Sequence, residues 1–290
     1  MFRLYINHKT SSEEWRNRIY DGSVFLMTKI DAAQKLCDFA QECIKEYIDE
    51  KNPQSAYLDW PVQQFIDKTS ALKNYFTNCL PVKEFIKKFV IEIGEETKEY
   101  YFDVPRIRVV PNYDYLNSGV SYLYKEHRDT WYGLPSCQIN VWMPIFAIDP
   151  QETMPLYPSY FNQKIENSSI EFDLKHWIEI ERPLAVKQKT TENRNHPLAL
   201  ETIDPRSKVL LAGSKGDTIL FSGRHLHGSQ PNKGNQIRYS IDFRLYHRAD
   251  LDNKTGPGRL DDRSSNKHYW ARDLFRVSDF ERYKVKGKIV

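Results

Sequence analysis

Two segments with strand-like sequence, GDTILFSG (216–223) and QIRYSIDFRLY (236–246), flank the histidine-containing hexapeptide RHLHGS (224–229). The first is a short apolar run that follows a glycine turn, and the second alternates between apolar and polar residues. Both patterns are typical of β-strands. We therefore expect two neighbouring antiparallel strands, with the histidines placed immediately after the end of the first.

A second histidine motif, His127-Arg128-Asp129, lies one hundred residues earlier in the chain. In an extended segment residues i and i+2 face the same side, so the His127 and Asp129 side chains can reach one ion. A third ligand must come from a distant strand, and His227 is the candidate, with His225 as the alternative on the same face. Two imidazoles and one carboxylate form the facial triad that holds non-haem Fe(II) and leaves coordination positions open.

Arg238 follows His227 by eleven residues and shares a strand face with Ser240. A guanidinium group can bind a carboxylate through two parallel hydrogen bonds, and a neighbouring hydroxyl can add a third. This pair predicts a receptor for 2-oxoglutarate, a dicarboxylate co-substrate. Asp242 and Arg244 continue the same face, and either could contact the substrate or the two could pair with each other.

The order His127-x-Asp129, then His227-Gly-Ser-Gln-Pro-Asn, then Arg238 resembles the phytanoyl-CoA dioxygenase-like branch of the 2-oxoglutarate oxygenases, which includes ectoine hydroxylases. The resemblance covers residues 105–247 in the order of its motifs and is specific around the two metal-ligand segments. It implies a double-stranded β-helix (jelly-roll, cupin-like) core, Fe(II) at His127, Asp129 and His227, and 2-oxoglutarate on Arg238. Because the family pattern places Gly-Ser directly after the ligand, His227 is preferred over His225.

The segments beside the metal motif supply further candidate site residues. In 137–146, a predicted strand, Gln138, Asn140 and Trp142 share one face, which we expect to line the barrel mouth. Gln138 and Asn140 could bind a 2-oxoglutarate carboxylate, although hydrogen-bonded core amides are an equally good interpretation. A second strand is expected at 121–126, where Tyr122 and Tyr124 face one way and could reach the co-substrate.

The substrate side of the site has weaker candidates. Trp131 and Tyr132 follow the ligand motif closely, and we expect them at the pocket rim, where aromatic side chains contribute apolar area. Trp142, Arg244 and His225 are the other residues expected to face the substrate. Arg128, between two ligands, is expected to point away from the metal and to form a structural ion pair.

These features predict an enzyme that hydroxylates an unactivated C–H bond of a small, polar substrate, with Fe(II), 2-oxoglutarate and O2 as cofactor and co-substrates. A carboxylate at Asp129 favours hydroxylation or desaturation, because halogenating relatives have a small residue there. Two alternatives remain open. A cupin-like metalloenzyme would use the triad without needing Arg238 and Ser240, and a non-catalytic jelly-roll binding protein would not need the metal.

Composition agrees with a globular enzyme. The 290 residues are 40% hydrophobic and 13% aromatic, enough for a substantial core. A formal net charge of +3 is too small to indicate nucleic-acid binding. No apolar stretch approaches the roughly 20 residues of a membrane span, and the N-terminus lacks a signal peptide. Four cysteines without CxxC spacing indicate free thiols and a cytoplasmic location. The oligomeric state cannot be read from the sequence.

We expect a single domain of residues 1–290 in three parts. Residues 12–95 form a helical flank on one face of the jelly roll, with helices at 31–50, 62–78 and 82–93. Residues 98–247 hold the strands, interrupted at 150–197 by an insertion whose aromatic content favours an ordered lid. Residues 248–290 form a polar extension with a short aromatic helix. The remaining histidines have no partners of a metal-binding kind nearby and are expected on the surface or in loops: His8, His176, His196, His247 and His268.

Overall fold

The computed structural model describes residues 2–211, 213–265 and 269–285. It contains one large sheet with the strand order β1-β2-β8-β5-β9-β3-β10, in which β4 also pairs with β9. All pairs are antiparallel except β1 with β2. The strands are β1 Leu4–Ile6, β2 Val24–Met27, β3 Tyr100–Phe102, β4 Arg106–Val110, β5 Ile139–Pro144, β8 Thr218–Ser222, β9 Arg238–His247 and β10 Phe275–Arg276.

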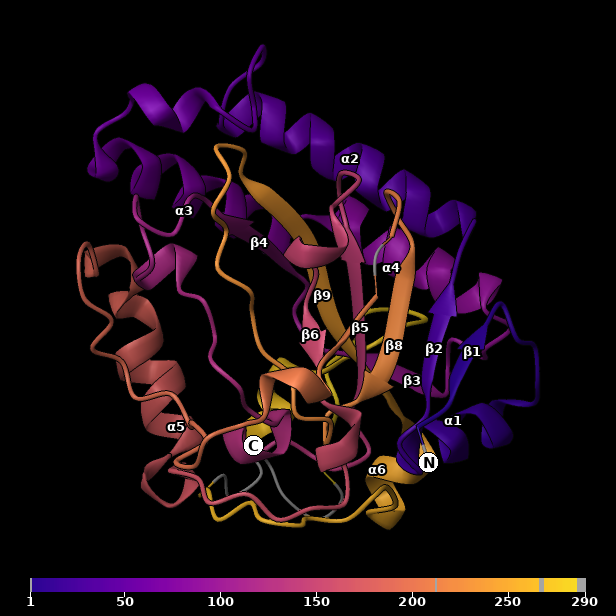
Figure 1. The fold of residues 1–290 in the computed structure, drawn as a ribbon. Helices are drawn as coiled ribbons and strands as arrows, with labels where there is room; N and C mark the ends of the chain where they lie inside the picture. Colours follow the sequence, from indigo (N-terminus) through magenta and orange to yellow (C-terminus); the bar gives the residue numbers. More distant parts are fainter. Residues whose placement is uncertain (1, 212, 266–268, 286–290) are drawn as a thin grey trace.

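Three long helices cover one face of this sheet (Figure 1). The helices of the chain are α1 Ser12–Tyr20, α2 Asp31–Tyr47, α3 Val62–Asn78, α4 Leu80–Glu92, α5 Leu174–His176 and α6 Arg248–Asn253. The apolar stripes of α2, α3 and α4 pack on the inward residues of β5 and β9; for example, the rings of Phe89 and Phe243 lie 6.0 Å apart, edge to face. Pro81 lies in the first turn of α4. Backbone N–H groups in a first turn have no partner within the helix, so the missing N–H of proline costs no helical hydrogen bond. Among the described residues, no helix has both the length and the apolar character required to cross a membrane.

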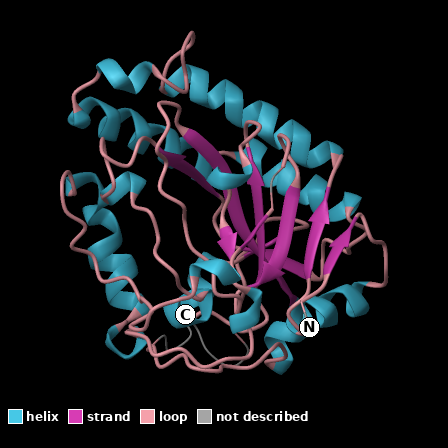
Figure 2. Cartoon of the chain, viewed as in Figure 1, coloured by secondary structure: helices cyan, strands magenta, loops and turns pink. Residues whose placement is uncertain are grey.

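A second, small sheet lies on the opposite side of the large one. It consists of β6 Pro155–Leu156 and β7 Val209–Leu210, and isolated bridges extend it from Leu156 to His227 and from His227 to His127. The predicted fold class is therefore confirmed: the protein is mainly β with flanking helices (Figure 2), and its strands form one large sheet and a second, two-stranded sheet.

Several local predictions were wrong. Residues 121–126 form no strand but an irregular segment that leads to the bridge at His127. The expected helical flank contains β2, which pairs with β8 in the large sheet, and the C-terminal extension adds β10 beside β3. The insertion begins with the 3₁₀ turn Pro150–Glu152, contributes β6 to the second sheet, and continues through short helical turns, including a π-helical turn at Trp177–Glu181 and a 3₁₀ turn at Arg182–Lys187.

Candidate metal centre

Two backbone hydrogen bonds bring the distant histidines together. His127 N donates to His227 O at 2.9 Å, and His227 N donates to His127 O at 3.0 Å, so the two imidazole rings lie 4.4 Å apart. Arg128 is extended, with φ −110° and ψ 141°, and therefore Asp129 faces the same side as His127. Asp129 Oδ1 lies 3.6 Å from His127 Nε2 and 3.9 Å from His227 Nε2. The structure thus assembles the predicted triad, whose possible ligand atoms lie within 4.8 Å of one another.

Both imidazoles are oriented for metal binding. His127 Nδ1 lies 2.7 Å from Lys125 O and His227 Nδ1 lies 2.9 Å from His225 O. A carbonyl oxygen only accepts, so Nδ1 carries the proton and Nε2 presents its lone pair to the triad. Burial, and then the charge of His127, lowers the pKa of His227 to about 4, which keeps this imidazole neutral at pH 7. Neutral imidazoles and a carboxylate are donors suited to Fe(II).

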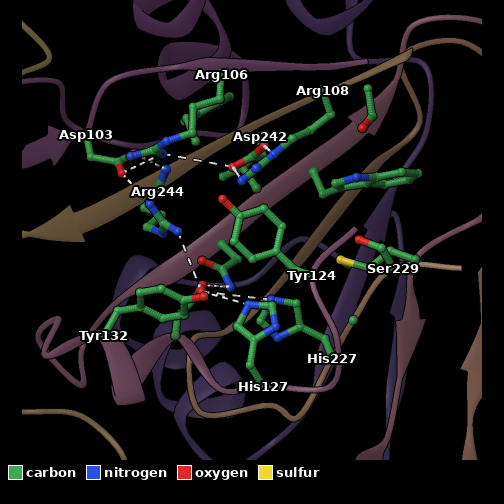
Figure 3. A pocket seen from close by; sticks show the side chains of 18 of the residues that line it. Asp103, Arg106, Arg108, Tyr124, His127, Tyr132, His227, Ser229, Asp242 and Arg244 are labelled. Atoms are coloured by element: carbon green, nitrogen blue, oxygen red, sulfur yellow. Dashed lines mark hydrogen bonds and ion pairs between the residues drawn. The ribbon is translucent and has the colours of Figure 1, made fainter. Parts of the chain in front are cut away.

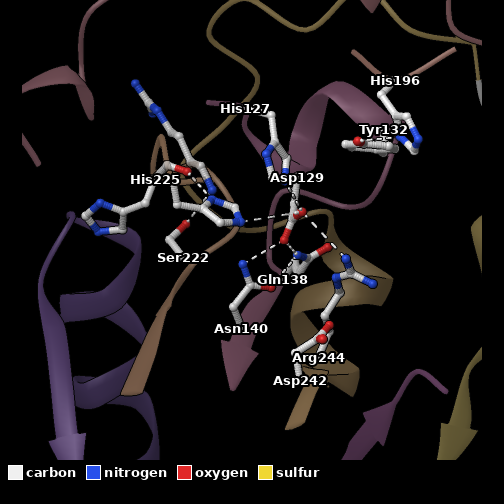
Figure 4. Close-up of polar contacts among 12 residues, drawn as sticks. His127, Asp129, Tyr132, Gln138, Asn140, His196, Ser222, His225, Asp242 and Arg244 are labelled. Atoms are coloured by element: carbon white, nitrogen blue, oxygen red, sulfur yellow. Dashed lines mark hydrogen bonds and ion pairs between the residues drawn. The ribbon is translucent and has the colours of Figure 1, made fainter. Parts of the chain in front are cut away.

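Three side chains hold the Asp129 carboxylate in place (Figure 4). Gln138 Nε2 and Asn140 Nδ2 donate to Oδ2 at 2.6 and 2.7 Å, and Arg244 Nη2 lies 3.5 Å from Oδ1. Burial alone would raise the pKa of Asp129, but the positive charge of Arg244 above all holds that pKa well below its usual range. With Oδ2 occupied by the two amides, Oδ1 is the oxygen turned to the histidines.

Three of the expected site residues lie elsewhere. Gln138 is fully buried behind Asp129, where it also accepts from Tyr246, and it does not line the cavity. Trp131 is not at the rim: the 3₁₀ turn Asp129–Tyr132 directs it inward, where its indole N–H donates to Asp261 at 2.8 Å. His225 points away from Asp129 and is packed between Phe161 and Phe221 (Figure 4). The preference for His227 over His225 as the third ligand agrees with this geometry.

A cavity of about 210 Å³ opens directly onto the triad. The expected residues Tyr124, Tyr132, Asn140, Trp142, Arg238, Ser240 and Arg244 all contribute to its lining. The insertion closes part of it with Leu174, Trp177 and Ile178. The binding roles of these side chains stay predictions, but the structure brings all of them to one chamber with the triad.

Arg238 has no carboxylate within ion-pair distance among the described residues. Its guanidinium donates to the backbone carbonyls of Glu152 and Gln230, and Nε is buried without a partner. Burial lowers the pKa of Arg238 to about 10, so the group stays charged at pH 7. A partly buried cation in this state favours an anionic ligand, because carbonyl oxygens compensate its charge incompletely.

The sequence interpretation missed a charged wall on the other side of the cavity (Figure 3). Arg108 binds Asp242 at 2.5 and 3.1 Å, Arg106 binds Asp103 at 2.9 Å, and Arg244 binds Asp103 at 2.7 Å. Asp242 and Arg244 therefore do not pair with each other but with partners from β4 and the turn before it. The alternation of arginines with apolar residues in RIRVV (106–110) was the available signal.

Two other sequence expectations can be compared with the structure. His196 lies in a loop, one of the two expected placements, but it is buried: its ring stacks on Tyr122 at 4.6 Å, and a 3.3 Å hydrogen bond joins its Nδ1 to the Tyr132 hydroxyl. Arg128 points away from the metal as expected and forms a 3.4 Å ion pair with Asp261. His268 lies outside the described residues.

No protein-family model and no curated protein matches the chain. Among solved structures, the chain is similar to EvdO2 from Micromonospora carbonacea var. aurantiaca complexed with 2-oxoglutarate, at 10% identity and TM-score 0.48 over 81% of this chain and 91% of that one. It is also similar to the non-heme monooxygenase ThoJ (11%, TM-score 0.45, 80% and 79%) and to EctD from S. alaskensis (12%, TM-score 0.42, 90% and 84%). With TM-scores below 0.5, these similarities do not assign a function to this chain.

Proposed function

We propose that this protein is an Fe(II)- and 2-oxoglutarate-dependent oxygenase of the phytanoyl-CoA dioxygenase-like kind. The reaction would be the hydroxylation of an unactivated C–H bond: R–H, 2-oxoglutarate and O2 give R–OH, succinate and CO2. The observation that supports this best is the cavity itself. It holds His127, Asp129 and His227 together with Arg238, a partly buried arginine that has no carboxylate within ion-pair distance among the described residues.

Iron bound with 2-oxoglutarate would supply the oxidising power, by reducing O2 at the expense of the keto acid. His127, Asp129 and His227 would hold the metal on one side and leave its other side to the cavity. Arg238, with Ser240 beside it on the same strand face, would anchor the distal carboxylate of 2-oxoglutarate. Gln138 and Asn140 would keep Asp129 bound through Oδ1 by occupying Oδ2.

The chain also limits the access of water to the reacting centre. Leu174, Trp177 and Ile178 from the insertion cover one side of the cavity, and Trp142 from β5 lines another. Such a cover would protect a strong oxidant from side reactions. The carboxylate of Asp129 would occupy a coordination position that a halide could otherwise take, which supports hydroxylation as the outcome.

The experiment that tests this function measures succinate formed from labelled 2-oxoglutarate in air with Fe(II) and ascorbate. Many oxygenases of this kind turn over slowly without substrate, so we expect iron-dependent succinate release by the wild type. His227→Ala, matched with His176→Ala at an exposed histidine outside the cavity lining, should abolish the release, and the control should keep it. Succinate release that did not depend on iron or on His227 would contradict the proposal.

A further inference from the structure

Arg182 differs from the other arginines on the charged wall. Arg108 makes two hydrogen bonds to Asp242, and Arg244 is held by Asp103 and Asp129. Arg182, from the insertion, makes no hydrogen bond to a described residue, and its nearest acidic oxygen is Asp273 Oδ2 at 3.7 Å. Its side chain lines the cavity and is 39% exposed. This guanidinium is therefore available to a ligand.

The carboxylates near Arg182 are shared among several arginines. The guanidinium groups of Arg106, Arg108, Arg182 and Arg244 share this wall with the carboxylates of Asp103, Asp242 and Asp273, and Arg244 also faces Asp129, one of the proposed metal ligands. Burial, and then the like charge of Arg106, lowers the pKa of Arg182. Two guanidinium groups in a confined cavity repel each other, and an anion between them would relieve that repulsion.

The carboxylate oxygens of this wall are engaged in hydrogen bonds more fully than the N–H groups of its arginines. Asp103 accepts from the side chains of Arg106 and Arg244 and from the Arg244 backbone N–H. Both oxygens of Asp242 accept from Arg108. Arg106, in contrast, uses a single nitrogen, Nη1, in its ion pairs. A cationic ligand would find few free oxygens on this wall, whereas an anionic ligand would find free N–H donors.

Deepening the proposed function, on which this inference rests, we propose that the substrate carries an oxyanion, a carboxylate or a phosphate, and that Arg182 together with Arg106 binds it. Only three contacts connect this position to the metal ligands: Arg106 to Asp103, Asp103 to Arg244, and Arg244 to Asp129. Arg182 is a specificity-determining residue that the insertion supplies.

Calorimetric titration of inorganic phosphate and of acetate into the full chain tests this site. The protein is loaded with Mn(II) and 2-oxoglutarate without oxygen, so that the triad and Arg238 are occupied, and ionic strength is held constant. The variants are Arg182→Gln, Arg182→Lys and, as a matched control, Arg206→Gln, which removes an arginine whose side chain is 89% exposed and lies outside the cavity.

We expect saturable binding of at least one anion by the wild type and by Arg206→Gln. Arg182→Gln should weaken it at least about tenfold, and Arg182→Lys should restore part of the loss, because charge-assisted hydrogen bonds dominate oxyanion recognition. Tighter binding of acetate would identify a carboxylate substrate, and tighter binding of phosphate a phosphorylated one. Retained 2-oxoglutarate binding in every variant shows that the fold is intact.

Two results would overturn the anion site: no saturable binding of either probe by the loaded wild type, or equal affinities in the wild type and Arg182→Gln. A different failure would point to the proposed function. If 2-oxoglutarate itself did not bind to the metal-loaded wild type, the oxygenase assignment would fall first, and the identification of the anion as a substrate group would fall with it.

Discussion

Arg238 and Arg244 lie on the same strand, β9, and face the same cavity, yet their surroundings are opposite. Arg244 is held by two carboxylates, Asp103 and Asp129. Within the described part of the chain, Arg238 donates to two backbone carbonyls alone and keeps a buried Nε without a hydrogen-bond partner. An arginine that is already neutralised positions a group of the protein, whereas one without an acid is prepared for a ligand. The first is expected to support the metal ligand Asp129, and the second is expected to hold the co-substrate.

Removing the ligand that Arg244 supports should have the largest effect. Asp129→Ala leaves two neutral imidazoles and no charge to offset that of the metal. We expect the affinity for Fe(II) to fall by more than about 100-fold, beyond the range seen when only a supporting residue is changed, and turnover to disappear. Metal content after dialysis measures this, and Asp204→Ala, at a solvent-facing carboxylate on the surface, is the control. Unchanged iron content would rule out Asp129 as a ligand.

Arg238→Gln should separate co-substrate binding from metal binding. The distal carboxylate of 2-oxoglutarate would lose its charged partner, which costs on the order of 2–5 kcal/mol in a buried site. That corresponds to a loss of about 30-fold or more in 2-oxoglutarate affinity, with Fe(II) affinity unchanged. A titration of 2-oxoglutarate into the iron-loaded protein reports it. A variant that bound the co-substrate as tightly as the wild type would place its anchor elsewhere.

Arg244→Gln should give the reverse pattern. Asp129 would lose the guanidinium that stabilises its charge and orientation, so we expect Fe(II) affinity to fall about 10- to 100-fold. At saturating iron, the affinity for 2-oxoglutarate should change little, because Arg238 is intact. Competition with a metal-sensitive dye measures the first quantity. If Arg244→Gln weakened 2-oxoglutarate and spared iron, the roles of the two arginines would have to be exchanged.

Tyr246→Phe is expected to have the smallest effect. It removes a 3.1 Å hydrogen bond to Gln138, which in turn supports Asp129. The loss of one hydrogen bond costs about 1 kcal/mol of unfolding free energy, and iron affinity should fall less than about tenfold. Chemical denaturation with and without Fe(II) measures both. A large loss of iron binding would mean that the amide support matters more than the Arg244 ion pair.

Two of the three proposed ligands could be predicted from local geometry, and the third from the family resemblance. The i, i+2 spacing of His127 and Asp129 fixes their common face, and the Gly-Ser after His227 distinguished it from His225. The charged wall could not be predicted from the sequence, because it depends on the register between two strands. β4 pairs with β9 so that Arg106 opposes Asp242 and Arg108 opposes Ser240. Trp131 was misplaced since a 3₁₀ turn replaces the extended backbone after Asp129. The position of His196 depends on the path of the whole insertion.

The most direct test of the metal and co-substrate site is an anaerobic visible spectrum of the protein with Fe(II), recorded before and after addition of 2-oxoglutarate. We predict a metal-to-ligand charge-transfer band that needs both additions, is absent in His227→Ala, and appears only at higher 2-oxoglutarate concentration in Arg238→Gln. Bound iron without such a band would favour a metalloenzyme that uses no 2-oxoglutarate. A protein that bound no iron at all would contradict the assignment of the triad.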